Sequence, residues 1–414
     1  MQHSKIIKGI DIGSSKITTI IGQYFENEDK HNIVAVSSVD ALGFRKGQII
    51  DLEKAAATIT QSIESTERMA GFQINDAFVS IASPQIESLN SKAVIAISNS
   101  SGEIEQNDVD RVIAASKTIT LPEGKEIIHV VPRIFTVDNQ EGITDPIGMN
   151  GVRLEVESHL VFASTPALKN LKKCFQEIGI NINQLCYSGL SAASTCLTDT
   201  EKELGVALVD IGGTITSITV FFQNSPVFCS TIPIGGDNVT NDLAIGLRLS
   251  ITDAQKVKLG LSKLTKNKSF ADDIKLSQMG FSDNDTRKIS LQTAVTGIIK
   301  PRLEEIFTMV ETEIEKSGFK NSIPSGIVLT GGGSLTVNSQ EICTKTIPLP
   351  LRLAKPAKVG GIVDNILNPS HTSSIGLLLY AQTKDQQSVN RKPSKISLGG
   401  FSSRLKKLLQ PLLP

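Results

Sequence analysis

The sequence of 414 residues contains no tryptophan, and aromatic residues make up only 4% of it. Its five cysteines are odd in number and form no C-x-x-C pair. This pattern argues against a disulfide framework and a zinc site, and it fits a reducing cytosol. The first residues lack the apolar core of a signal peptide, and no stretch approaches the roughly 18 apolar residues of a spanning helix. We therefore expect a body that is neither secreted nor embedded in a membrane.

The sequence also lacks net charge, because 42 basic residues balance 42 acidic ones. This balance excludes the strong basic field of a general nucleic-acid binder, so we expect no nucleic-acid partner. The average hides an uneven distribution. Residues 384–414 carry seven basic residues and one acidic residue (+6), so the other 383 residues carry 35 basic and 41 acidic (−6). We expect the acidic body to avoid an anionic membrane and the basic tail to seek it.

Two glycine-rich segments, 8–15 and 209–214, resemble each other. Each follows an apolar β-branched run and leads into alternating Thr and Ile residues, which predicts a β-hairpin with a glycine-rich tip. Backbone N–H groups at such a tip can surround phosphate oxygens, and a carboxylate before each tip, Asp11 or Asp210, could hold Mg²⁺ through its waters. Either segment alone is more simply interpreted as an ordinary tight turn. The presence of two matching segments favours a pair of tips that bind a polyphosphate between them. The candidate ligands are Gly13, Ser14, Ser15 and Lys16 in the first tip and Gly212, Gly213 and Thr214 in the second.

Further candidates follow in the second half of the chain. A further glycine run follows directly after a buried-strand pattern and consists of Gly331, Gly332 and Gly333. Because glycines have no side chain, an adenine or ribose could lie close to the backbone there. Gly235 and Gly236 introduce a predicted helix start. Lys258, on the next predicted helix, could reach a nucleotide or could lie on an ordinary solvated helix face.

Alternating helix and strand patterns surround these motifs and predict two α/β lobes with an inserted subdomain. Helices are expected from Asp51 to a stop at Gly71, from an N-cap at Thr165 to Gly179, and over 298–317. Residues 84–161 form a block richer in extended segments around one short helix near 108–116. The polar segment 382–400 contains little apolar material and reads as a flexible linker.

The order of these motifs resembles the superfamily of actin, DnaK-type chaperones and sugar kinases, and most closely the bacterial cell-division family FtsA. The most specific stretch lies in the inserted block and includes His129-Val-Val-Pro132, Asp145-Pro146 and Arg153-Leu154-Glu155. The resemblance implies an α/β, two-lobed actin-like ATPase fold with an inserted small α+β subdomain and a C-terminal amphipathic helix. The expected parts are a first lobe at 1–83 and 162–203, the inserted subdomain at 84–161, a second lobe at 204–381, a linker at 382–400 and the helix at 401–414.

The resemblance also implies a function. An FtsA-like protein binds ATP with Mg²⁺, forms filaments with itself through the inserted subdomain, and tethers FtsZ filaments to the cytoplasmic face of the plasma membrane at the division site. It also recruits later division proteins. The second lobe of the family binds the C-terminal peptide of FtsZ, and Ile299-Lys-Pro301-Arg302 resembles the motif whose arginine contacts that peptide.

Several departures from the superfamily pattern bear on catalysis. A glycine of the second tip is replaced by Thr214, and a carboxylate near the metal is replaced by Ser217. Ser188 stands where efficient ATPases place a Glu or Gln near the attacking water, and Gln255 replaces a ribose-facing Glu. A serine without an activating partner is not a general base at neutral pH. We expect nucleotide binding with slow or negligible turnover, and we assign no catalytic residue.

The tail after the linker predicts an amphipathic helix. At 100° per residue its apolar side chains share one arc and its basic residues lie beside or opposite that arc. Such a helix could dock on the body, but the polar linker and flanking charges favour a membrane surface. The expected membrane-facing set is Phe401, Arg404, Leu405, Lys406, Lys407, Leu408, Leu409 and Leu412.

Three other interpretations remain. A pilus-assembly ATP-binding adaptor shares the inserted subdomain, but the basic amphipathic tail argues against it. A sugar or acid kinase needs a carboxylate base and a sugar-binding insert, and we find neither. His129 and His159 lie in extended segments without partner ligands at metal-binding spacing, so structural roles are the better interpretation.

Overall fold

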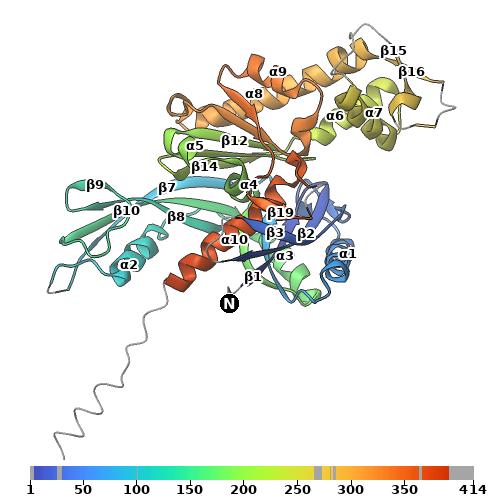
Figure 1. Cartoon of the computed structure of the whole chain (residues 1–414). Coiled ribbons are helices and arrows are strands. Elements are labelled where there is room, and N and C mark those ends of the chain that lie inside the picture. The colour runs from blue at the N-terminus through green and yellow to red at the C-terminus, as the bar shows by residue number, and fades with distance from the viewer. Residues whose placement is uncertain are drawn as a thin grey trace, which may run out of the picture.

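The computed structural model describes residues 4–25, 30–99, 101–264, 273–279, 281–282, 286–362 and 366–390. Figure 1 shows two α/β lobes and a smaller inserted sheet that projects to one side of them. No helix in this described part is both long enough and apolar enough to cross a membrane.

A six-stranded sheet forms the first lobe, in the order β11-β6-β1-β2-β3-β19. β1 and β2 pair antiparallel with Ile12 opposite Ile17, so residues 13–15 form a hairpin tip, as the sequence predicts. β6 runs parallel to β1, and β11 runs parallel to β6. The strands are β1 (Ser4–Ile12), β2 (Lys16–Phe25), β3 (His31–Asp40), β6 (Asp76–Ile81), β11 (Asn181–Tyr187) and β19 (Val359–Gly361), with a short hairpin of β4 (Phe44–Arg45) and β5 (Gln48–Ile49) beside them.

The second lobe repeats this arrangement in a five-stranded sheet, β14-β13-β12-β17-β18. β12 and β13 pair antiparallel with Ile211 opposite Thr216, which confirms the second hairpin. β17 runs parallel to β12, and β18 runs parallel to β17. From β14 to β18 the pairing directions match those from β3 to β11, so the two hairpin tips occupy equivalent positions in the two sheets. The strands are β12 (Val206–Ile211), β13 (Thr216–Phe222), β14 (Ser225–Ile232), β17 (Ile327–Thr330) and β18 (Leu351–Leu353).

Helices cover the first sheet and begin and end largely where local signals predict. In α1, the Asp51 carboxylate accepts a hydrogen bond from the Lys54 N–H at 3.1 Å, and Gly71 ends the helix with φ of 77°. The expected N-cap at Thr165 is wrong by one residue: β10 continues to Ser164, so Ser164 is the cap and Thr165 is already helical. The helices are α1 (Leu52–Ala70), α3 (Thr165–Glu177), α4 (Ser188–Cys196) and α10 (Thr372–Asn390). α5 (Asp199–Leu204) follows α4 and packs on β13 of the second sheet.

The second lobe has its own helical layer. The helix predicted over 298–317 is α8, and a π-helical segment, η3, leads into it from residue 292. The apolar face of α8 is buried as expected, through Leu303, Ile306, Phe307, Val310 and Ile314. The elements are α6 (Gly236–Leu247), α7 (Ile251–Leu264), β15 (Asp273–Lys275), η2 (Leu276–Met279), β16 (Lys288–Ser290), η3 (Gln292–Ile299), α8 (Lys300–Lys316), η4 (Lys320–Ser322), η5 (Gly332–Leu335), α9 (Ser339–Thr346) and η6 (Pro369–His371).

The inserted segment forms a four-stranded antiparallel sheet, β7-β10-β8-β9, packed by one helix. It has its own small core, in which Val109 and Val112 of the helix meet Phe135, Leu154 and other sheet residues. The insert also contacts the second sheet, because the Ser88 hydroxyl donates to the Cys229 carbonyl and accepts from the Cys229 N–H. Its elements are β7 (Glu87–Ala96), α2 (Gln106–Ser116), β8 (Lys125–Val137), β9 (Gln140–Ile143) and β10 (Arg153–Ser164).

The last described helix corrects the expected linker. α10 continues to Asn390, so residues 382–390 are helical rather than part of a flexible segment. Contacts with the first sheet explain this: Gln382 hydrogen-bonds to His31 at 2.7 Å, and Asp385 accepts from Lys5 at 3.0 Å and from the Tyr24 hydroxyl at 3.2 Å. The rest of the expected linker and the predicted helix at 401–414 lie outside the described residues.

Candidate functional site

The two hairpin tips face each other across a cavity of about 340 Å³ between the lobes. They touch directly, because the Thr214 N–H donates a hydrogen bond to the Ser14 hydroxyl at 3.0 Å. The first tip connects β1 to β2 and the second connects β12 to β13, so residues about 200 positions apart are brought together. From the tips, the cavity is lined by Asp11, Gly13, Ser14, Ser15, Lys16, Asp210, Gly212 and Gly213.

Two glycines of this cavity could not be replaced without displacing their neighbours. A Cβ on Gly213 would lie 2.7 Å from Asp237 Oδ2 and from Ser15 Cβ. A Cβ on Gly331 would lie 2.2 Å from Asp210 Oδ1, and Gly331 also has φ of 86°. The bare backbone therefore keeps space beside the tips that side chains would fill.

Asp11 and Asp210 contribute two buried carboxyl groups. Burial raises the pKa of Asp11 to about 7; the Ser80 hydroxyl opposes this rise, whereas the nearby charge of Asp210 adds to it. Burial also raises the pKa of Asp210 to about 6, opposed by a hydrogen bond that it accepts from the Ser373 hydroxyl at 2.8 Å. Ionising both carboxyl groups is therefore unfavourable in the free protein. A bound divalent cation would stabilise their ionised forms, so the pair fits a metal site.

Lys16 is the cation beside these carboxyl groups. Its Nζ donates to Ser370 Oγ at 3.3 Å and to His371 Nε2 at 3.2 Å. Burial lowers the pKa of Lys16 to about 8, although both aspartates oppose that change. Burial and the Lys16 charge lower the pKa of His371 to about 4, so His371 is neutral at pH 7 and accepts the bond.

Lys258 lies in the wall of the cavity and not on a solvated helix face. Its buried Nζ donates to the Gly236 carbonyl at 2.8 Å and to the Thr240 hydroxyl at 2.7 Å. The Thr240 hydroxyl in turn donates to Gln255 Oε1 at 2.7 Å. Lys258 therefore joins the start of α6 to α7, and burial lowers its pKa to about 8.

The structure brings most of the predicted ligands together. Gly236, Lys258 and residues 331–333 line the same cavity as the tips. Two predicted residues do not: Thr214 binds Ser14 through its N–H, and Gly235 packs against the carbonyls of the second tip. Sequence reasoning missed Ser370, which lies in η6, and Ser373, which lies in the first turn of α10. It also missed Asp237, Leu259 and Leu335, whose place in the cavity depends on how α6, α7 and η5 pack within the second lobe.

The comparison with known proteins identifies the family. The family model "SHS2 domain inserted in FTSA" matches residues 84–162, and "Cell division protein FtsA" matches residues 207–376. The cell division protein FtsA of Pseudomonas aeruginosa is 35% identical over 95% of this chain and 93% of its own length. FtsA of Bacillus subtilis is 34% identical over 92% of this chain and 84% of its own.

The chain belongs to the FtsA family of cell-division proteins.

Solved structures of other proteins share the FtsA-family architecture at low identity. A chain of the PilM–PilN type IV pilus biogenesis complex aligns with a TM-score of 0.61 and 14% identity, covering 91% of this chain and 98% of its own. MreB5 of Spiroplasma citri bound to ADP aligns with a TM-score of 0.54 and 15% identity, covering 93% and 99%. These likenesses and the inserted-domain match confirm the expected actin-like fold with its insert.

Ser188 and Ser217 meet at the cavity wall, where the superfamily pattern led us to look for carboxylates. Their hydroxyl oxygens lie 3.1 Å apart, and both side chains are buried. In the described part of this FtsA-family chain, neither hydroxyl hydrogen-bonds to a histidine or carboxylate. The pair is therefore not arranged as an activated base.

Arg302 lies outside the cavity, on α8. Its Nε and Nη2 donate to the two carboxylate oxygens of Asp242 on α6, at 2.5 and 3.1 Å, and Nη1 contacts Glu305. The side chain is 26% exposed. Asp242 thus fixes the orientation of an arginine that still reaches the surface.

The histidines of the insert have structural partners. His129 Nε2 accepts from the Tyr187 N–H at 2.8 Å, and its Nδ1 hydrogen-bonds to the Tyr380 hydroxyl at 3.1 Å. His159 Nδ1 hydrogen-bonds to Asn90 at 2.7 Å. His129 thereby ties the insert to β11 and α10, which supports the structural interpretation.

Proposed function

We propose that this protein is an ATP-binding division adaptor that polymerises and tethers FtsZ filaments to the cytoplasmic face of the plasma membrane at the division site. The observation that carries the nucleotide part is the cavity between the two matching tips, with Asp11 and Asp210 at its base. Family membership supplies the division context.

The residues present fit ATP and Mg²⁺. Backbone N–H groups of the tips and the hydroxyls of Ser14 and Ser15 would bind phosphate oxygens, and Asp11 and Asp210 would hold the waters of the metal ion. The metal would supply charge neutralisation for the phosphates. Leu259 and Leu335, both partly exposed, offer apolar surface for a base. Spiroplasma MreB5, which shares the fold, has been solved with ADP and with AMPPNP, which supports the same type of ligand here.

Nucleotide binding is tested by titrating the purified full chain with a fluorescent ATP analogue and Mg²⁺. We expect saturable binding that Gly213→Ala weakens at least tenfold, because the new Cβ would collide with Ser15 and Asp237. Gly297→Ala is the matched control, since its Cβ would meet no atom within 4 Å. Equal binding by Gly213→Ala and the parent protein, or no saturable binding at all, would contradict the proposal.

The FtsZ peptide is proposed to bind beside α8, with Arg302 as its charged contact. The Asp242 pair holds the guanidinium in place, so an incoming peptide carboxylate meets a positioned donor. A synthetic FtsZ C-terminal peptide should pull down the parent protein but not Arg302→Glu. Asp242→Asn keeps the arginine but removes the ion pair that positions it, so it should weaken binding less than Arg302→Glu does. Retention of Arg302→Glu on the peptide would contradict this assignment.

The remaining parts of the proposed function rest on the insert and on the tail. The insert folds around its own core and contributes no residue to the lining of the cavity, so its surface remains available for contacts between subunits. The basic tail, 401–414, is proposed to bind anionic lipid. A filament on the membrane would then present many FtsZ sites and recruit later division proteins.

A further inference from the structure

A second cavity, of about 260 Å³, lies where α4, α5 and α10 meet. It shares no lining residue with the cavity between the hairpin tips. α5 leads into the second lobe and packs on β13, whereas α10 packs on β1 and β6 of the first lobe. The cavity therefore lies at a junction of the two lobes. Its lining residues are Ser194, Asp199, Lys202, Lys358, Leu379, Gln382 and Thr383.

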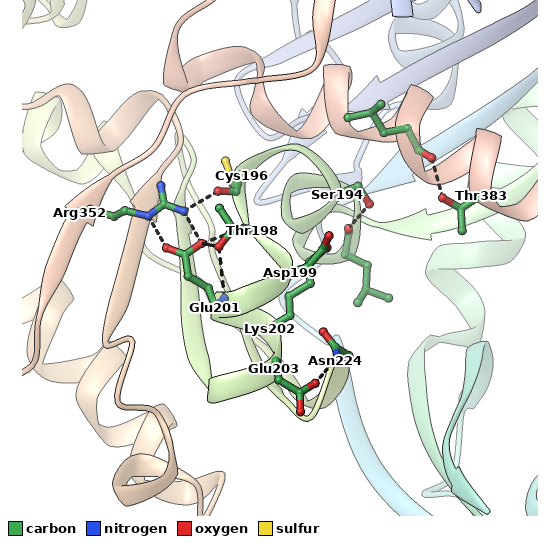
Figure 2. Close-up of polar contacts among 12 residues, drawn as sticks. Ser194, Cys196, Thr198, Asp199, Glu201, Lys202, Glu203, Asn224, Arg352 and Thr383 are labelled. Atoms are coloured by element: carbon green, nitrogen blue, oxygen red, sulfur yellow. Dashed lines mark hydrogen bonds and ion pairs between the residues drawn. The ribbon is translucent and has the colours of Figure 1, made fainter. Parts of the chain in front are cut away.

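The acidic residues of α5 next to this cavity are mostly engaged elsewhere. Arg352 donates to both carboxylate oxygens of Glu201, at 2.5 and 2.7 Å, and the same carboxylate accepts from the Thr198 N–H. Glu203 accepts from the Asn224 side chain. Figure 2 shows both interactions, with the Arg352–Glu201 pair on the left and the Glu203–Asn224 pair below Lys202. α5 is thereby held in place. The charge of Glu201 still acts on Lys202, but the hydrogen bonds of this carboxylate go to Arg352 and Thr198.

Lys202 is the central cation of the cavity. Its side chain is only 21% exposed, and its one ion pair within the described residues is a 3.9 Å contact with Asp199, whose side chain is 91% exposed. Burial lowers the pKa of Lys202; the charge of Asp199 opposes this change, the charge of Lys358 adds to it, and the charge of Glu201 opposes it. Two lysines and one exposed aspartate leave a net positive charge in a partly enclosed space.

The backbone fixes the second lysine. Lys358 adopts φ of 63°, and its carbonyl accepts from the His31 N–H at 3.1 Å, directly before β19 joins β3. A non-glycine residue in the left-handed region is held there by its surroundings. Both cations therefore stand on fixed backbone, one from each lobe.

Polar groups of α4 and α10 complete the wall. Ser194 and Thr383 each donate to a carbonyl of their own helix at 3.1 Å, and a hydroxyl can rotate to donate to a ligand instead. Gln382 uses its carbonyl oxygen on His31, and no described residue accepts a hydrogen bond from its amide nitrogen. Figure 2 shows Ser194 and Thr383 on the side of the cavity opposite Glu201 and Arg352.

We propose that this second cavity binds a phosphate group, presented either by a free phosphate ion or by a phosphate monoester such as a lipid headgroup. A phosphate group accepts hydrogen bonds from several directions. Lysine ammonium groups surrounded by hydroxyl and amide donors can supply such hydrogen bonds together with positive charge. The bound anion would bridge Lys202 on the second-lobe side to Lys358 and α10 on the first-lobe side. It would thus restrain the lobes and the helix that leads toward the tail.

The test compares phosphate binding by four full-length proteins at constant ionic strength, by isothermal titration with inorganic phosphate. They are the parent, Lys202→Gln, Lys358→Gln and the control Lys345→Gln, whose exposed lysine pairs with Glu341 on α9. All four share the same nucleotide cavity, so a difference between them belongs to the second cavity. We expect Lys202→Gln and Lys358→Gln to bind at least fivefold more weakly, and the control to bind like the parent.

Lys202→Arg keeps the charge and should retain binding, which separates a lost ligand contact from a lost fold. A parallel titration with glycerol 3-phosphate distinguishes the sources: tighter binding than inorganic phosphate indicates a monoester ligand, and weaker binding indicates the free ion. Equal affinity of Lys202→Gln and the parent for both compounds would overturn the proposal, whatever the outcome of the ATP titration.

Discussion

Asp11 and Asp210 reach the same cavity from the ends of β1 and β12, strands of two different sheets. Burial opposes ionisation of both carboxyl groups, and Lys16, whose own protonation burial also opposes, is the cation between them. The free protein thus keeps a charge arrangement that a metal and phosphates would stabilise. Residues at such sites often lower stability in favour of ligand binding.

Asp11→Asn should therefore make the free protein more stable at pH 8 while weakening its Mg²⁺-dependent nucleotide binding. The pKa of Asp11 is raised from 3.8 to about 7, so the folded state binds this proton more tightly than the unfolded state. The Asp11 contribution to the free energy of unfolding therefore falls as pH rises from about 4 to about 7, by at most about 4 kcal/mol. Thermal melts across that range, with and without nucleotide, check the prediction.

Asp51→Asn provides the control for this measurement. The Lys54 contacts lower the pKa of the exposed Asp51, so its contribution is present at neutral pH and is lost on acidification, the opposite sign. Asparagine also caps helices well, so this variant should not gain stability at pH 8. A parent protein that is as stable at pH 8 as at pH 5, with no gain in Asp11→Asn, would contradict the argument.

ATP turnover should be slow, at least about 100-fold below the 1–100 s⁻¹ typical of kinases. The Ser188 and Ser217 hydroxyls contact each other, and no histidine or carboxylate among the described residues hydrogen-bonds to them as an activating base. Phosphate release by the purified protein measures the rate, and Ser188→Ala should leave it unchanged. A kinase-like rate, or loss of most activity in Ser188→Ala, would show that the serine takes part in hydrolysis.

At this scale the sequence predicts residues whose roles depend on the local chain, such as the tip glycines and the aspartates before them. It does not predict Ser373, which binds Asp210 from 163 positions away, because that contact exists only once the lobes have assembled. Thr214 was predicted as a phosphate ligand, and its buried hydroxyl has no hydrogen-bond partner within the described residues, so the ligand role stays a prediction.

At the scale of elements, α10 connects the cavity between the hairpin tips to the chain that leads to the tail. Ser373 in its first turn binds Asp210, and Gln382 and Asp385 near its other end bind β3, β1 and β2. Local signals predicted α1 correctly because its caps lie in its own sequence. The composition of 382–390 resembles a linker, and its helical state depends on partners in distant strands. Tertiary contacts override propensity there.

Gly376→Ala should destabilise the protein by about 1–3 kcal/mol, because α10 crosses α4 at this residue. A Cβ at position 376 would lie 1.9 Å from the Ser191 carbonyl oxygen, so the two helices would have to separate. Gly297→Ala, in the open segment η3, should leave stability unchanged or raise it by up to about 1 kcal/mol. Chemical denaturation of both variants checks the pair, and equal stability of the two would refute the role of close helix packing.

At the scale of the whole molecule, two sheets with the same strand order enclose one cavity, and a third sheet projects beside them. The repeat of the hairpin motif predicted two lobes, but the matching order of all five strands was not visible in the sequence. The charge distribution was readable from the start: the body carries −6 and residues 384–414 carry +6. An anionic surface should therefore repel the acidic body and attract the basic tail, so the two effects belong to separate parts of the chain.

The tail should bind membrane through its apolar face, so Leu408→Glu should release the protein to the soluble fraction. Gln410→Glu adds the same charge on the predicted polar face and should stay bound. Each apolar side chain contributes at most about 1.5–3 kcal/mol, whereas ordering the backbone costs about 1–2 kcal/mol per residue, so a single tail binds weakly. Co-sedimentation with anionic liposomes compares the variants, and equal retention would refute the predicted face.

Weak single tails make polymerisation decisive for membrane attachment. Once one subunit of a filament is bound, its neighbours are held near the surface at a high effective concentration, so a row of tails binds far more tightly than one. Dilute monomers should therefore partition weakly onto anionic liposomes, and filaments of the same protein should partition strongly. Higher salt should reduce the binding of both, because the basic residues contribute through screened attraction. If monomers and filaments bound equally, attachment would be a property of the single chain and not of the polymer.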